Sequence, residues 1–105
     1  MSIHLHRSAD QLCADFHGIL SFHDHAEGER LLADLDQALE AAPAREIRFD
    51  LAAVEALDSH WLGVFIRALR RARTAGAEFV LARPGPHLQR LFAAVELDRA
   101  VTIRG

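Results

Sequence analysis

The stretch that decides the fold reads EIRFDLAAVEALDSHWLGVF and occupies residues 46–65. Apolar and polar residues alternate from Glu46 to Leu51, which predicts a strand with one buried side. Residues 52–57 are then expected to form a loop, and Asp58 or Ser59 is expected to cap a helix, because both residue types are common N-caps. A strand, a loop and a capped helix in this order predict one unit of an α/β fold.

The helix that begins at Asp58 or Ser59 is expected to bury one side. At about 100° per residue, its apolar residues fall together: Trp61, Leu62, Phe65, Ile66 and Leu69. Its arginines face away from them: Arg67, Arg70 and Arg71. Gly76 stands where a helix C-cap glycine belongs, and residues 78–82 predict the next buried strand.

Two strands and a helix are expected before this unit. Alternation from Ile3 to Arg7 predicts an edge strand, and the apolar run from Leu12 to Leu20 predicts a second strand. The turn between them is short, so the pair is expected to be antiparallel. Asp24 is the expected N-cap of the following helix, with Glu27 completing a capping box. A leucine stripe marks the buried side of that helix: Leu31, Leu32, Leu35 and Leu39.

A third helix and a closing strand are expected after the unit. A turn at residues 84–86 leads into the helical stripe Leu88, Leu91, Phe92 and Val95. Ala100 to Arg104 predicts the closing strand. The expected order is β-β-α-β-α-β-α-β, with right-handed crossovers. We therefore predict a single α/β domain over residues 1–105, with a mostly parallel sheet and an antiparallel N-terminal edge strand.

The composition is that of an ordinary globular protein. The chain has 105 residues, of which 50% are hydrophobic and 26% charged, enough for one core and too few for two domains. The formal net charge of −3 argues against nucleic acid as the main partner, because phosphate binding needs a basic face. Acidic residues gather in residues 24–40 and arginines in residues 67–73, as on the solvent faces of two helices.

The sequence also indicates a compartment. Cys13 is the only cysteine, which excludes an intramolecular disulfide and fits a reducing environment. The N-terminus lacks the long apolar run of a signal peptide. No stretch approaches the roughly 20 apolar residues needed to span a bilayer. We therefore expect a cytoplasmic protein that does not insert into a membrane.

The loops that follow parallel strands gather along one edge of a sheet, where α/β proteins usually bind their ligands. We expect that edge to collect polar side chains from three loops: His23, His25, Asp58, Ser59, His60 and His87. Asp58 and Ser59 are first of all a capping pair. A serine at a helix N-terminus is also accessible to a kinase, and phosphorylation would add about −1.5 to −2 charges there. A partner fitted to a neutral hydroxyl would not tolerate that change.

No motif for catalysis or cofactor binding is present. Ser59 beside His60 is not a catalytic triad, and there is no G-x-S-x-G elbow. Cys13 lies within a predicted strand and is expected to be a small core residue rather than a nucleophile. The scattered glycines form no phosphate-binding loop. Histidine pairs occur without the spacing of a metal motif: His4 with His6, and His23 with His25. We expect neither an enzyme nor a cofactor or metal site.

Three stretches carry a recognisable pattern: DLAAVEALDSHWLGVF from Asp50, AGAEFVL from Ala75, and LFAAVELD from Leu91. The order is a strand ending in D-L, an aspartate–serine pair opening a helix, and a strand bounded by glycine. Gly18 begins a G-x-L sequence before the first predicted helix. This pattern resembles the STAS domain, which anti-sigma factor antagonists share with the cytoplasmic domains of sulfate transporters. The resemblance covers nearly the whole chain.

The resemblance implies a function. In antagonists of this family, the serine directly after the aspartate is phosphorylated by a partner kinase that is itself an anti-sigma factor. Carried over, that serine is Ser59, in a bacterial partner-switching pathway. The unphosphorylated protein would bind the kinase and free a sigma factor, and the phosphorylated protein would release the kinase. The implied partner-binding surface includes Ser21, His23, Asp24, Asp58, His60, Trp61, Leu62 and Gly63.

Two residues depart from the family pattern D-S-S-G-L-G. His60 replaces its second serine, and Trp61 replaces the glycine that follows. Trp61 is either an interface anchor or an inward-facing cap on the core. These departures favour a rival hypothesis, a subunit of a transporter or signalling complex that docks constitutively, for example on a transport ATPase, without phosphorylation. A third hypothesis is a small-ligand sensor at the same edge.

Overall fold

The computed structural model describes residues 1–105, which build a five-stranded sheet in the order β1-β2-β3-β4-β5. The strands are β1 (Ser2–Ser8), β2 (Gln11–Leu20), β3 (Glu46–Leu57), β4 (Glu78–Ala82) and β5 (Thr102–Arg104). β1 pairs with β2 in antiparallel fashion, and every later pair is parallel. The predicted element order and sheet type are confirmed.

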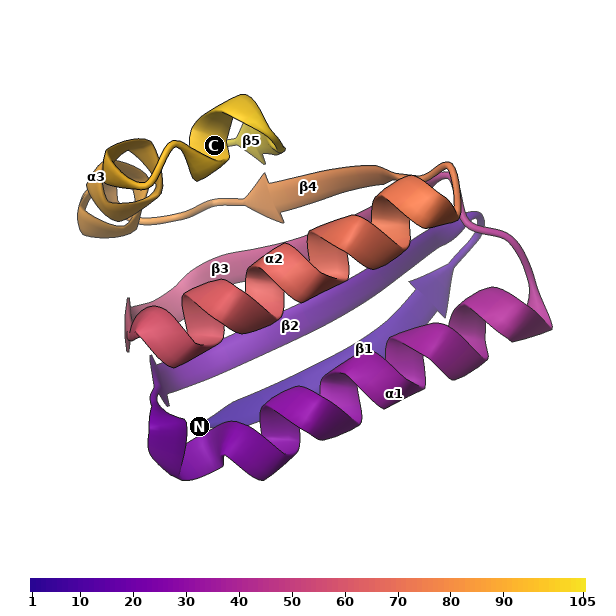
Figure 1. Cartoon of the computed structure of the whole chain (residues 1–105), viewed down its shortest axis with the longest axis horizontal. Helices are drawn as coiled ribbons and strands as arrows, with labels where there is room; N and C mark the ends of the chain where they lie inside the picture. Colours follow the sequence, from indigo (N-terminus) through magenta and orange to yellow (C-terminus); the bar gives the residue numbers. More distant parts are fainter.

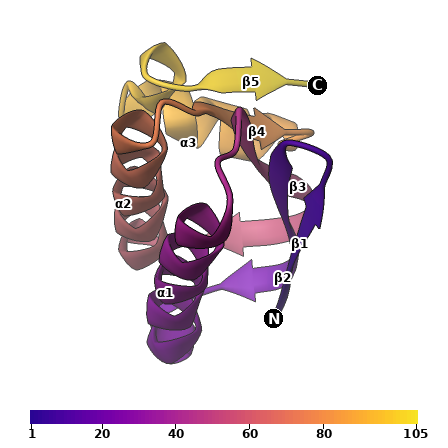
Figure 2. The same cartoon turned by 90° about the vertical axis from the view of Figure 1, so that its right-hand side faces the viewer.

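The helices gather on one face of this sheet. They are α1 (His25–Ala41), α2 (Ser59–Thr74) and α3 (Pro86–Ala94), with short 3₁₀ turns η1 (Phe22–Asp24) and η2 (Leu97–Arg99). Because consecutive parallel strands are neighbours, each right-handed crossover returns the chain to the same side. α1 and α2 therefore lie next to each other against the sheet, whose other face has no helix over it (Figures 1 and 2).

Aromatic rings at the centre of the core join the sheet to α2. The ring centroid of Phe16 on β2 lies 4.9 Å from that of Phe49 on β3 and 5.7 Å from that of Phe65 on α2. Trp61 meets Phe16 edge-on at 6.3 Å. All four side chains are fully buried. Interlocked rings of this kind resist displacement, so the first turn of α2, which carries Ser59, has a defined position on the sheet.

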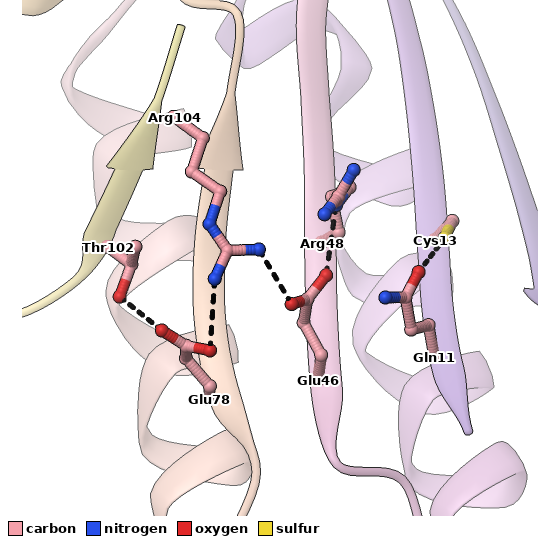
Figure 3. A network of polar contacts seen from close by, with 7 residues as sticks. All are labelled: Gln11, Cys13, Glu46, Arg48, Glu78, Thr102 and Arg104. Carbon is pink, nitrogen blue, oxygen red and sulfur yellow. Dashed lines mark hydrogen bonds and ion pairs between the residues drawn. The ribbon is translucent and has the colours of Figure 1, made fainter.

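Ion pairs cover part of the sheet face that has no helix over it. Glu46, only 7% exposed, accepts hydrogen bonds from Arg48 at 2.9 Å and from Arg104 at 3.0 Å. Arg104 reaches across β4 from β5 and also contacts Glu78 (Figure 3). Val80, which the alternation of β4 places on this face, is fully buried. Paired side chains thus cover the part of this face formed by β3, β4 and β5.

Two titratable groups on the same face have shifted pKa values. Burial raises the pKa of Asp50, but the ion pair with Arg83 and a hydrogen bond from the N–H of Ala52 outweigh it, so the net pKa is lowered. Burial raises the pKa of the Cys13 thiol. Cys13 is half-buried on this face, so the prediction of a core cysteine is wrong. Alternation along β2 directs its two neighbours into the core instead.

β3 is longer than predicted and runs to Leu57, through the residues expected to form a loop. It pairs with β2 as far as Leu20 opposite Leu57, whereas β4 pairs with it only as far as Asp50 opposite Ala82. β2 and β3 therefore project beyond the rest of the sheet. The projecting part contains register shifts and Gly18 with a φ of 93°. These irregularities break the alternation that would have identified the strand.

Smaller differences concern element ends and helix faces. Asp24 occupies the N-cap position of α1 but makes no capping hydrogen bond, so the predicted capping box with Glu27 is not formed. Ile66 and Val95 were assigned to buried stripes and are 37% and 49% exposed. β5 begins at Thr102, because η2 precedes it. Smaller residues complete the inner side of α2: Val64, Ala68 and Ala72.

Candidate functional site

Asp58 joins the end of β3 to the start of α2. Its Oδ1 accepts a hydrogen bond from the backbone N–H of Trp61 at 3.1 Å, which caps the helix. Its Oδ2 accepts a second hydrogen bond from the backbone N–H of Phe22 at 2.8 Å. One carboxylate therefore ties the turn after β2 to the first turn of α2. Of the two predicted caps, the structure uses Asp58.

Ser59 is the first residue of α2 and is exposed. A helix N-terminus carries partial positive charge and unpaired N–H groups, so it tolerates an added anion. A phosphate on Ser59 would lie at the surface beside the Asp58 carboxylate. It would change the charge of this surface without entering the core.

Trp61 points inward, which decides between the two orientations considered from the sequence. Its side chain is 0% exposed, and its Nε1–H donates to the carbonyl oxygen of Ser21 at 2.8 Å. That oxygen also accepts from the N–H of Asp24. The Trp61 indole thus holds the turn after β2 in place by a hydrogen bond from the core, and the Asp58 carboxylate holds the same turn by accepting from Phe22. Trp61 stabilises the site and cannot itself contact a partner.

Phe22 lies at the centre of an exposed group of rings. Its side chain is 62% exposed, although it is apolar. The ring stacks on His25, with centroids 5.0 Å apart, and meets the edge of His60 at 5.3 Å. The Nε2 atom of His60 is buried and has no hydrogen-bond partner. Phe22 is not among the residues predicted to bind a partner, and its only sequence signal is an apolar residue within a polar turn.

The predicted edge of the sheet is assembled only in part. η1 carries His23, which is exposed, and Asp24, which is half-buried, next to Asp58. β2 and β3 project beyond β4, so the loop after β4 lies short of their ends. From that loop His87 contacts the side of β3, where its Nε2 bonds to the carbonyl oxygen of Glu55.

The outer side of α2 continues the site. Gly63 lies one turn after Ser59, and a Cβ atom built on it would have no neighbour within 4 Å. Leu62 beside it is half-buried. Ile66 lies almost one turn further along and is partly exposed. Residues spaced by three or four lie on one side of a helix, so Ser59, Gly63 and Ile66 form a line along the outer side of α2. Ser59 and Ile66 are exposed in it, and Gly63 is half-buried.

The acidic and basic segments noted in the sequence pair with each other. Arg67 of α2 donates to both carboxylate oxygens of Glu29 on α1, at 2.6 and 3.2 Å. This hydrogen bonding lowers the pKa of Glu29. Arg71 donates to Asp36 of α1 at 2.9 Å. The two segments lie on solvent faces as expected, since Glu29, Asp36 and Arg67 are exposed, and these ion pairs connect α1 to α2 at the surface.

The site is not a cleft. None of the surface hollows is lined by Asp58, Ser59 or His60. The largest lies between the C-terminal halves of α1 and α2. No group of three or more His, Cys, Asp or Glu side chains is arranged to hold a metal ion. None of the helices combines the length and apolarity that crossing a bilayer requires.

Comparison with known proteins identifies relatives of this arrangement. A family model described as "Mlab, STAS domain" matches residues 22–104. A Thermotoga maritima protein described as an anti-sigma factor antagonist is 23% identical, with a TM-score of 0.84 over 98% of this chain and 86% of that one.

Two further structures extend the comparison. The Bacillus cell fate determinant SpoIIAA in its phosphorylated form is 16% identical, with a TM-score of 0.75 over 97% of this chain and 90% of that one. A sulfate transporter family protein from Wolinella succinogenes is 10% identical, with a TM-score of 0.72 over 92% of this chain and 78% of that one. At these identities the structural matches establish the fold.

Proposed function

This chain belongs to the STAS domain family, and from that premise we propose that it is a regulatory protein-binding module of the anti-sigma factor antagonist kind. It acts in a bacterial partner-switching pathway, in the cytoplasm, and residues 1–105 work as one domain. Its partner is an anti-sigma factor that is also a serine kinase. Reversible phosphorylation of Ser59 controls the binding, and the module itself catalyses no reaction.

The observation that carries this proposal is the position of Ser59. It is exposed at the N-terminus of α2, while the neighbouring Asp58 performs the capping. A kinase can therefore reach the hydroxyl without unfolding the helix. A phosphate there would bring about −1.5 to −2 charges beside an existing carboxylate. Like charges and the cost of desolvating a phosphate would oppose any partner that covers this surface in the neutral state.

The structural relatives support the proposal at the level of the family. SpoIIAA, which has the same fold, is known in a phosphorylated form. The Thermotoga maritima protein of the same fold is described as an antagonist.

A second candidate function is constitutive docking on a transporter or signalling complex, without phosphorylation. Two observations favour it. His60 and Trp61 depart from the family pattern beside Ser59, and a sulfate transporter family protein shares the fold. The inward orientation of Trp61 weakens the first observation, because the indole does not occupy the partner's side of the surface.

Phosphopeptide mapping separates the two functions. The protein would be expressed in its own host, recovered and mapped for phosphate, with Ser59→Ala as the test variant. Ser8→Ala is the matched control, because Ser8 is an exposed serine far from α2. The proposed switch requires phosphate on Ser59, lost in Ser59→Ala and kept in Ser8→Ala. An unmodified Ser59 under growth and stress conditions would favour constitutive docking.

A further inference from the structure

We propose that Phe22 is the anchor of the docking surface, and that the partner is a protein whose apolar pocket receives this ring while its main chain packs against Gly63. The docking surface is defined here as Phe22, Ser59, Gly63 and Ile66. The inference rests on the proposed function in placing the partner on the Ser59 side of α2. Beyond the proposed function, the inference specifies which residues contact the partner and what shape the partner's surface must have.

Phe22 is held in place before any partner arrives. Its backbone N–H is bonded to Asp58 Oδ2, and the η1 turn is closed by the hydrogen bond from Asp24 N–H to the oxygen of Ser21. The rings of His25 and His60 flank it on two sides. Its outer part still remains in water, at 62% exposure. An exposed aromatic ring held rigidly is the kind of side chain that dominates binding, because little freedom is lost on association.

Gly63 supplies the second observation. Glycine inside a helix is less stable than alanine, so a reason for it is expected. At Gly28 on α1 the reason is internal, since an added Cβ would lie 3.1 Å from Cγ2 of Val64. At Gly63 the same Cβ would meet nothing within 4 Å. No contact within the chain therefore requires a glycine at position 63. The close approach of another molecule's main chain would require one, because any larger side chain would stand in its way.

The shape and charge of the docking surface indicate a protein partner. The Phe22 ring projects outward, so it requires a concave apolar pocket. Carboxylates border the surface at Asp24 and Asp58, and Arg67 is already paired with Glu29. Arg70, one turn after Ile66, is exposed without an ion pair. One arginine beside two carboxylates does not make the basic face that nucleic acid or anionic lipid requires. Ile66 extends the apolar contact along α2 beyond Gly63.

The test begins with a photo-crosslinker, p-benzoylphenylalanine, placed at Ile66 in the full chain and expressed in the host. The same crosslinker at Val95, an exposed residue at the C-terminal end of α3 that is not part of the docking surface, is the control. We expect one protein to crosslink from position 66 and not from position 95. Crosslinks only to lipid, only to a second copy of the chain, or to nothing would overturn the inference.

The captured protein is then purified and titrated against variants of this chain. Phe22→Ala is expected to weaken the dissociation constant by about tenfold or more, and Val95→Ala to leave it unchanged. Gly63→Ala is expected to weaken binding and yet to raise the melting temperature of the free chain. If Gly63 were needed only for the structure of the chain, Gly63→Ala would lower both the affinity and the melting temperature. Unchanged affinity in Phe22→Ala and Gly63→Ala would overturn the inference.

A phosphomimetic variant keeps this test apart from the proposed switch. If Phe22→Ala weakens binding and Ser59→Glu does not, the anchor stands and the proposed switch fails. If Ser59→Glu weakens binding and both Phe22→Ala and Gly63→Ala do not, the switch stands and the anchor fails. Thermal unfolding of each variant shows that the loss of affinity is not a loss of fold.

Discussion

The carboxylate of Asp58 bonds to two N–H groups, one of them on Phe22, 36 residues earlier in the chain. Sequence reasoning could anticipate the cap, because aspartate before a helix is a frequent N-cap. The second bond depends on where the turn after β2 lies, which only the folded sheet determines. Asp58, which the sequence predicts only as a local helix cap, thus also connects two segments of the site that are distant in the chain.

Replacing Asp58 by alanine should therefore cost more than losing a cap alone. We expect a loss of about 2 kcal/mol in the free energy of unfolding, from one N-cap and one further hydrogen bond. The matched control is Asp24→Ala, since Asp24 holds the N-cap position of α1 without a capping bond. That variant should change stability by less than about 0.5 kcal/mol. Urea unfolding of both variants measures the difference, and equal losses would contradict it.

Asp50 gives a prediction in pH. Its pKa is lowered in the folded protein, so its ionised form stabilises the fold above the unfolded pKa of about 3.9. That stabilisation is lost as the pH falls through the lower folded pKa. Asp50→Asn should therefore be less stable than the parent at neutral pH, by about 1 kcal/mol. The difference should vanish in acid below the folded pKa, as followed by urea unfolding across pH. If Asp50→Asn stayed less stable than the parent below the folded pKa, the loss of stability would come from packing and not from the charge of Asp50.

At the scale of elements, the two glycines of the helix pair offer a matched test. Gly63→Ala should raise the free energy of unfolding by up to about 1 kcal/mol, because the new methyl meets nothing. Gly28→Ala should gain less or lose stability, because its methyl would press on Val64. Thermal unfolding of both variants checks the order. A more stable Gly28→Ala than Gly63→Ala would show that α1 and α2 are not closely packed at Gly28.

The elements themselves were largely predictable from sequence. β4 falls on residues 78–82 as expected, since a short apolar run bounded by turn residues is typical of a buried strand. The predicted β3 was too short because Leu51, Ala52, Ala53 and Val54 are all apolar, so the apolar–polar alternation stops there. Pairing with β2 nevertheless extends the strand to Leu57. Phe22 was not predicted, because its one sequence signal, an apolar residue within a polar turn, does not separate an exposed ring from a buried one. Its exposure follows from contacts between distant segments.

At the scale of the whole molecule, the sheet has helices on one face and a layer of ion pairs on the other. Glu46→Ala should test that layer, because it leaves Arg48 and Arg104 without their nearly buried partner. We expect a loss of about 1–3 kcal/mol. The control Glu78→Ala removes a more exposed partner of Arg104 and should cost less than about 1 kcal/mol. Equal losses in chemical denaturation would show that burial of Glu46 carries no special weight.

The surface around the start of α2 is where this fold presents an apolar ring, an exposed serine and a glycine without neighbours together. The proposed function depends on a charge change at that serine. The most direct test uses the chain with phosphoserine incorporated at position 59 and the unmodified chain, each titrated against the protein captured by crosslinking.

We expect the phosphorylated chain to bind at least about tenfold more weakly than the unmodified chain, since the phosphate meets a surface fitted to a neutral hydroxyl. Equal affinity of the two forms would contradict the switch and would leave constitutive docking as the function of this surface.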